Sequence, residues 1–435
     1  MDFKIKLLTS YENIYKKIFS SCRFRVVFII TIITSFFLIL NRNGEYNIIV
    51  AFLVIILNIL ELVKHRKNGF LLIVNIIILY CNYSITICNY FSTFDTIFTG
   101  FSNDYVSVLG INILCLFSLF LYLLSPSENI KDNECEKPIT SSDRYNFLIE
   151  IALVVLLCLI CYFGFTRPSQ SGMRGTPSAI YEYSIILFIM GYYYSGDRLL
   201  WKIVFTLIAL VYALQNFIFG GRITGIQVIM TCGISLFVDK INLKRFSILS
   251  LIGIPLLTLI GIQRGEISLS IESILEAFQA ICKNKLALDT SYSAFYTSLT
   301  FLKAMEYTPL ASRLFMFVCF FLSMIFGGRI PNSNLADYTR EKFLHYWGGV
   351  APFFGYFYFG LIGVFLLAWY ISFLKKKIIN SSENDFIKCL SVYVAVTAFR
   401  WYLYSPTQLF RGVMLLWIVY ISMKYFDKIV VKARL

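Results

Sequence analysis

Long apolar runs dominate the chain, and short polar segments separate them. Each run holds roughly 16–22 residues, about the length that an α-helix needs to cross the hydrocarbon core of a membrane. The pattern predicts an all-α fold, a polytopic membrane helix bundle of about 12 transmembrane helices with one large extracytoplasmic loop. The predicted spans are 25–40, 47–63, 70–90, 105–124, 147–165, 180–195, 201–219, 223–238, 246–262, 353–374, 386–404 and 410–426.

The large loop is the segment 263–352, which mixes charges, turns and apolar patches. It divides the chain into an N-terminal membrane bundle, 1–262, and a C-terminal bundle, 353–435, with about nine and about three helices. Inside the loop, the run Leu314–Phe326 predicts a short re-entrant or interfacial helix, and a thirteenth span is the alternative. Apolar residues at helical spacing over 271–285 predict an amphipathic helix on the membrane surface.

Basic residues fix the predicted orientation. With the N-terminus inside, the inner loops and tails carry most of the 39 Lys and Arg residues, as expected for cytoplasmic segments. We therefore expect a membrane protein with both termini and the run Lys375–Lys377 in the cytoplasm and the large loop outside. The net charge of +14 follows from the same rule, so it does not indicate a nucleic-acid partner.

Arginines on the predicted outer side are exceptions to the enrichment of basic residues in cytoplasmic loops, so each of them needs a functional or structural explanation. Guanidinium groups offer planar paired donors that match phosphate oxygens, so a group of them at one membrane level favours a diphosphate ligand. The alternative for each arginine is an extended side chain that reaches the lipid headgroups. The candidate diphosphate-binding residues are Arg167, Arg174, Arg222, Arg264, Arg400 and Arg411.

One histidine, His345, lies in the predicted outer loop close to its junction with a span. Imidazole titrates near neutral pH, so His345 is a candidate general base, and a hydrogen-bonding structural histidine is the alternative. Glu341 precedes it by four residues and would share its face on a helix, which makes it the second catalytic candidate, with Asp337 as another acid that could orient His345. Nucleotide-binding and zinc-protease motifs are absent from the sequence, so we expect no cofactor and no metal.

In these features the chain resembles the bacterial O-antigen and capsule repeat-unit polymerases, the Wzy family, and more distantly the O-antigen ligases. The resemblance rests on the span and loop architecture, on Gly220-Gly221-Arg222, on Arg264 at the head of the loop, and on His345 before the Gly/aromatic run 348–363. Relatives often carry an acid in the stretch corresponding to 355–360, and this chain has none there.

The resemblance implies a metal-independent glycosyltransferase that joins undecaprenyl-diphosphate-linked oligosaccharide repeat units at the periplasmic face of the inner membrane. Its partners would be these lipid-linked glycans, membrane lipid and a chain-length regulator protein, without nucleic acid. A lipid-linked oligosaccharide flippase and an O-antigen ligase are the alternatives. The flippase is expected to carry charges within many spans and to lack a long outer loop.

Overall fold

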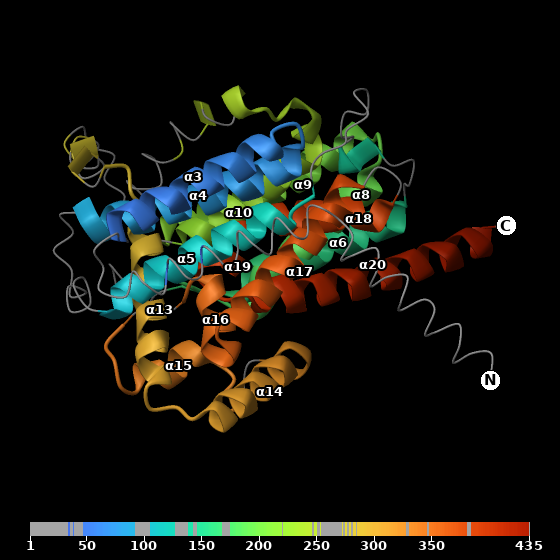
Figure 1. Cartoon of the computed structure of the whole chain (residues 1–435). Helices are drawn as coiled ribbons and strands as arrows, with labels where there is room; N and C mark the ends of the chain where they lie inside the picture. Colours follow the sequence, from blue (N-terminus) through green and yellow to red (C-terminus); the bar gives the residue numbers. More distant parts are fainter. Residues whose placement is uncertain are drawn as a thin grey trace, which may run out of the picture.

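The computed structural model is built almost entirely of helices (Figure 1). It describes residues 47–91, 105–126, 138–141, 146–167, 175–219, 221–245, 285–327, 330–345, 348–380 and 384–434, with isolated positions between them. The elements are α3 (Asn47–Lys64), α4 (Gly69–Phe91), α5 (Tyr105–Leu124), η3 (Ile139–Ser141), α6 (Phe147–Phe163), β1 (Phe165–Thr166), β2 (Thr176–Pro177), α7 (Ala179–Tyr183), α8 (Ile185–Ser195), α9 (Leu199–Ile218), α10 (Arg222–Phe237), η4 (Val238–Lys240), α13 (Asp289–Met305), α14 (Leu310–Phe326), α15 (Leu335–Arg340), α16 (Ala351–Phe359), α17 (Leu361–Ile379), α18 (Asp385–Val396), α19 (Ala398–Leu403) and α20 (Thr407–Arg434).

Within the described residues, six helical segments are long and apolar enough to cross a membrane: α3, α4, α5, α9, α10 with η4, and the part of α20 up to Ile429. This confirms the prediction of a helical protein with several membrane-capable helices. The predicted spans 25–40 and 246–262 lie almost wholly outside the described residues, as does the predicted amphipathic helix over 271–285.

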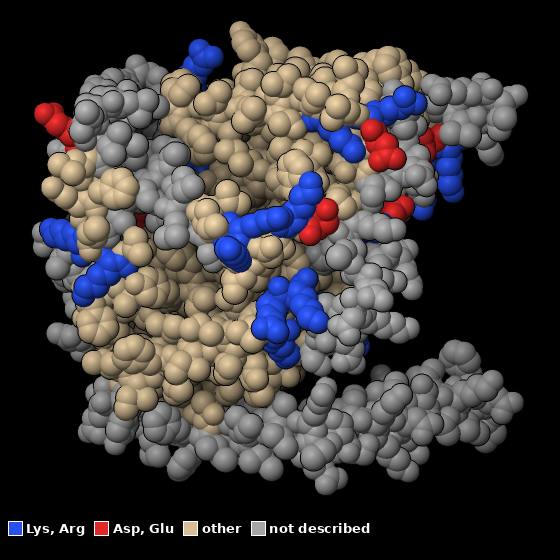
Figure 2. Space-filling view, turned by 90° about the horizontal axis from the view of Figure 1, so that it is seen from above, with Lys and Arg blue, Asp and Glu red and all other residues tan. Residues whose placement is uncertain are grey.

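Helices α3, α9 and α20 bury one face and leave another apolar face exposed, whereas α4 and α5 are mostly buried. In α9, Phe205, Ala209 and Tyr212 are buried, whereas Leu207 and Leu214 are more than half exposed. A helix that is apolar on both faces suits a bundle whose outer surface contacts lipid. Figure 2 shows one side of the molecule, where uncharged side chains cover most of the surface and Lys and Arg form a few small clusters.

The predicted span 353–374 is wrong as a single helix. The chain reverses at Gly360, whose φ of 61° lies in the left-handed region that glycine adopts without strain. Helices α16 and α17 then pack against each other so closely that a Cβ on Gly363 would overlap the carbonyl group of Gly355. The glycines in the Gly/aromatic run therefore permit a tight helical hairpin at this point.

Two other predicted spans are broken rather than continuous. The span 180–195 divides into α7 and α8 at Ser184, and the span 386–404 divides into α18 and α19 at Thr397. The Thr397 and Ser184 hydroxyls donate to the carbonyls of Tyr393 and Tyr181 at 2.6 and 2.7 Å. These bonds satisfy backbone carbonyls at the points where the helices are interrupted. With these breaks, the C-terminal region 353–435 holds five described helices, where about three were predicted.

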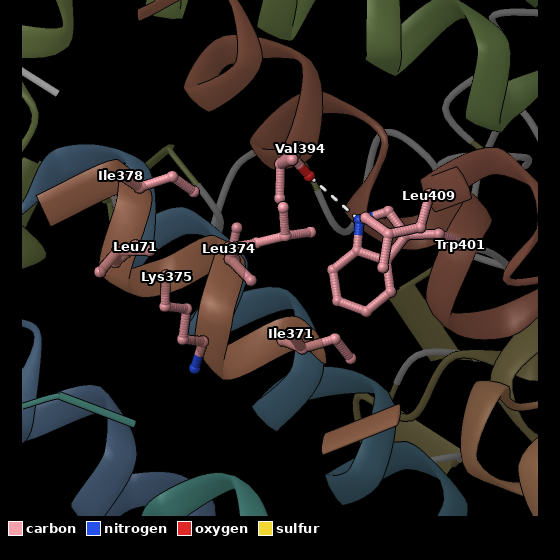
Figure 3. A pocket seen from close by; sticks show the side chains of 9 residues that line it. Leu71, Ile371, Leu374, Lys375, Ile378, Val394, Trp401 and Leu409 are labelled. Carbon is pink, nitrogen blue, oxygen red and sulfur yellow. Dashed lines mark hydrogen bonds between the residues drawn. The ribbon is translucent and has the colours of Figure 1, made fainter. Parts of the chain in front are cut away.

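Trp401 fixes the second break. Its indole N–H donates across the break to the carbonyl of Val394 at 3.1 Å, and its side chain is fully buried (Figure 3). The neighbouring residue, Arg400, is thereby held at a defined angle to α18.

The segment 285–345, predicted as part of the outer loop, packs against the bundle. The backbone carbonyls of Lys285 and Leu286 accept hydrogen bonds from Tyr83 and Tyr80 of α4, and α13 contacts α4, α5, α15 and α16. Figure 1 shows α13, α14 and α15 gathered away from the C-terminus, with α14 at the lower edge of the molecule, below the long helices. The run Leu314–Phe326 is helical as predicted, and its helix begins one turn earlier, at Leu310.

A buried ionic cluster joins α3, α4 and α17 at the end of the bundle where α3 and α17 finish. The Lys375 ammonium donates to Glu61 Oε1 at 2.6 Å and to Asn75 Oδ1 at 2.7 Å, and Glu61 lies 3.3 Å from His65 Nδ1. In Figure 3 the Lys375 side chain points away from Trp401 and toward the N-terminal helices. Lys375 was predicted to face the cytoplasm with its two neighbours, and the structure instead buries it against a carboxylate, while Lys376 and Lys377 are exposed.

A candidate anion site lined by two arginines

Arg400, on the short helix α19, is held by three side chains from two other helices. Its guanidinium lies 2.7 Å from Glu182 Oε1 on α7, and it donates to Thr224 Oγ1 at 2.7 Å and to Gln227 Oε1 at 3.1 Å on α10. These contacts use three of the five N–H donors of an arginine. Within the described residues, two donors are thus left for a ligand on the open side of Arg400.

Arg411 lies at the start of α20, and Tyr183, the residue after Glu182, packs against it. The guanidinium carbon is 5.4 Å from the Tyr183 ring centre, a distance typical of a cation–π contact. On the α14 side, the guanidinium lies 3.9 Å from the position that a Cβ on Gly327 would take. Helix α7 therefore positions both arginines, one through Glu182 and the other through Tyr183.

Arg400 and Arg411 line the same cavity, whose volume is about 260 Å³. Its described lining holds no Asp or Glu, but Glu182, just outside the lining, offsets the charge of Arg400. The net positive potential of the cavity therefore comes mainly from Arg411 and from the N-terminus of α20, where the helix dipole is positive. The volume is slightly below the ~300–1,000 Å³ usual for small-molecule sites, so the cavity suits a headgroup rather than a whole lipid. The other lining residues are Phe320, Ser323, Ser333, Asn334, Leu335, Ala336, Gly348, Phe354, Tyr404, Ser405, Thr407 and Gln408.

The other described candidate arginines, Arg167 and Arg222, do not line this cavity. Arg222 begins α10 and forms an ion pair of 3.3 Å with Asp289. Arg167 is exposed at the end of β1. Arg174 and Arg264 lie outside the described residues. The structure thus brings two of the four described candidates to one cavity, and their role as diphosphate ligands stays a prediction.

His345 is buried and does not line the cavity. Its Nε2 lies 2.9 Å from Thr339 Oγ1. The argument that Glu341 and His345 share a helical face is wrong, because α15 ends at Arg340 and Glu341 is an exposed residue in the following turn. Three residues after His345, however, Gly348 lines the cavity, and the N–H of Gly349 donates to the carbonyl of Leu403 on α19 at 3.0 Å.

Several residues of the site were not predicted from the sequence. Glu182, which pairs with Arg400, has no sequence pattern around it that indicates this role. Asn334 lines the cavity and binds Asp337 Oδ2 through its amide at 2.7 Å. The polar run 404–408 was a usable signal, because it lies between Arg400 and Arg411 and interrupts two apolar stretches.

The fold and the cavity define a helical protein with several helices that could span a membrane and a small arginine-lined site among broken helices. Comparison of the chain with protein-family models, curated proteins and solved structures finds no match.

Proposed function

We propose that this protein is a polysaccharide polymerase, which joins undecaprenyl-diphosphate-linked oligosaccharide repeat units at the periplasmic face of the bacterial inner membrane. One observation carries the proposal: two arginines from different helices line one cavity whose described lining has no carboxylate. The leaving group of the proposed reaction is a diphosphate, and charge-assisted arginine contacts are the protein's strongest means of holding it.

The proposed step is a glycosyl transfer. The hydroxyl oxygen of the acceptor sugar forms a bond to the donor's anomeric carbon, and the bond from that carbon to the diphosphate oxygen breaks. The electron pair leaves with undecaprenyl diphosphate, where Arg400 and Arg411 stabilise the developing charge. The hydroxyl proton passes to a general base, for which His345 remains our hypothesis. Asp337, which binds the cavity residue Asn334, is the acid that could orient it.

The proposed orientation follows from the distribution of basic residues, with both termini in the cytoplasm and the arginine cavity at the outer level. A flippase would bind the same diphosphate, and a ligase would use the same chemistry on a different acceptor. The partners of the proposal are lipid-linked glycans, membrane lipid and a chain-length regulator.

The test is chain extension by the purified protein in vesicles that contain the lipid-linked repeat unit. Arg400→Ala and Arg411→Ala should each lower kcat/KM by about 30- to 1,000-fold, because one lost diphosphate contact costs roughly 2–4 kcal/mol in the transition state. Lysine at either position should restore part of the rate, since it lacks the paired donors. Arg66→Ala, an exposed arginine after α3, is the control with unchanged activity.

The product distribution separates the three functions. Products longer than one repeat unit require a polymerase. Transfer of a single unit to lipid A core would establish a ligase, and translocation without a new glycosidic bond would establish a flippase. Normal chain lengths in both alanine variants would contradict the role of the cavity.

A further inference from the structure

Helix α14 has one face toward the protein and one apolar face that the described chain leaves uncovered. Phe317 and Phe320 pack against aromatic rings of α16, with ring centres 4.6 Å apart for Phe317 and Phe359. On the other face, Phe315, Phe321 and Phe326 are all more than half exposed. An uncovered stripe of this kind marks a surface for lipid or a partner.

The packed face of α14 is also a wall of the arginine cavity. Phe320 and Ser323 line that cavity together with Arg411 of α20, and α14 contacts both α16 and α20. Phe326 lies three residues after Ser323 and four after Leu322, so the exposed side chains of Leu322 and Phe326 share the edge of the stripe nearest Ser323. The cavity and the apolar stripe are therefore separated by the width of one helix.

Helix α20 continues this surface beyond the cavity. Arg411 is followed by apolar side chains, and Trp417, Ile418 and Ile421 lie exposed along the helix. A ligand held at Arg411 thus has a polar anchor at one end of an apolar strip formed by α14 and α20.

We infer that α14 and the first half of α20 border a lateral opening, through which the isoprenoid chain of a polyprenyl diphosphate runs from the bilayer to the arginine cavity. The occupant follows from charge and continuity: two arginines suit the diphosphate, and the adjoining apolar stripe suits a branched hydrocarbon chain. This inference rests on the proposed function for the identity of the lipid.

Site-specific photocrosslinking tests the opening. The photoreactive residue p-benzoylphenylalanine replaces Leu322 or Phe326, or Leu207 on the exposed face of α9 as the matched control; all three side chains are exposed. The protein is placed in phosphatidylethanolamine and phosphatidylglycerol vesicles with a small fraction of undecaprenyl diphosphate, irradiated, and analysed by mass spectrometry.

At positions 322 and 326 the isoprenoid adduct should exceed that at position 207 by roughly tenfold, as expected for a lipid held by charged contacts. Arg411→Ala should remove this enrichment and leave the phospholipid adducts unchanged. Equal adduct ratios at all three positions would mean that bulk bilayer lipid alone covers α14, and would overturn the inference.

Chain extension measured in the same vesicles separates the two proposals. Extension without enrichment at α14 overturns the lateral opening alone. Enrichment without extension overturns the polymerase and supports the opening as the binding route of a polyprenyl diphosphate.

Discussion

The contact between Glu182 and Arg400 provides a sharp test of how the site is held together. The pair is 2.7 Å apart, with 24% of the Glu182 side chain and 14% of the Arg400 side chain exposed. A hydrogen bond to a charged group contributes about 1.5–3 kcal/mol, and partial exposure reduces this to about 1–2 kcal/mol. Glu182→Ala leaves Arg400 with two neutral partners, so its orientation toward the ligand is less well fixed.

We therefore expect Glu182→Ala to lower kcat/KM for chain extension by roughly 5- to 30-fold, the rate equivalent of 1–2 kcal/mol. Glu182→Gln keeps an oxygen acceptor for Arg400 and loses only the charge. Since neutral hydrogen bonds are about half as strong as charge-assisted ones, the glutamine variant should lose about half of that free energy. Glu306→Ala, which removes an exposed carboxylate paired with Lys303, is the matched control.

A double-mutant cycle decides whether Glu182 acts through Arg400. If it does, adding Glu182→Ala to Arg400→Ala should change the rate less than about twofold, because residues in one network are not additive. A further 5- to 30-fold loss in that background would refute the reasoning and give Glu182 an independent role.

Three other predictions concern a buried ion pair, a close contact between two helices and the candidate general base. Lys375→Met should lower the free energy of unfolding by about 3–5 kcal/mol, because it removes the ammonium group from the buried Glu61 carboxylate and leaves only His65 beside it, whereas the exposed Lys376→Met should not; thermal unfolding in detergent measures both. Gly363→Ala should cost about 3 kcal/mol or more through overlap with the opposing helix backbone, while Gly233→Ala, with open space around it, should be tolerated, as read from the yield of monodisperse protein. His345→Gln should lower chain extension by about 10²–10⁴-fold if the histidine is the general base; near-normal extension at matched protein levels would assign it a structural role beside Thr339.

The sequence was sufficient to predict a helical protein with several membrane-capable helices, because apolar runs of spanning length carry that information directly. It was not sufficient to predict where helices break. The run 353–374 is continuously apolar, and its reversal depends on the close approach of Gly355 and Gly363, which lie on two separate helices. Hydropathy cannot predict this reversal, because an apolar run that contains glycine has the same hydropathy in one straight helix as in two helices folded back on each other.

The sequence indicated which residue type could bind an anion, but not how the residues are arranged. Arg400 and Arg411 were among the candidate arginines, and they line one cavity. Arg222 instead pairs with Asp289, an acid 67 positions away in the chain, which no local pattern could indicate. The Glu341–His345 argument failed because it assumed that a helix continues past Arg340.

The breaks and the site are connected. Arg400, which lines the cavity, lies just after the helix break at Thr397. Glu182 and Tyr183, which hold Arg400 and Arg411 in place, lie just before the break at Ser184. Non-helical backbone is tolerated within a membrane protein where protein or a polar cavity surrounds it, and a continuous helix would turn successive side chains by a fixed angle. A break removes that constraint, so short helices such as α7 and α19 can aim a carboxylate and a guanidinium at each other. The helix interruptions are therefore what allows two arginines from an otherwise regular bundle to face one small cavity.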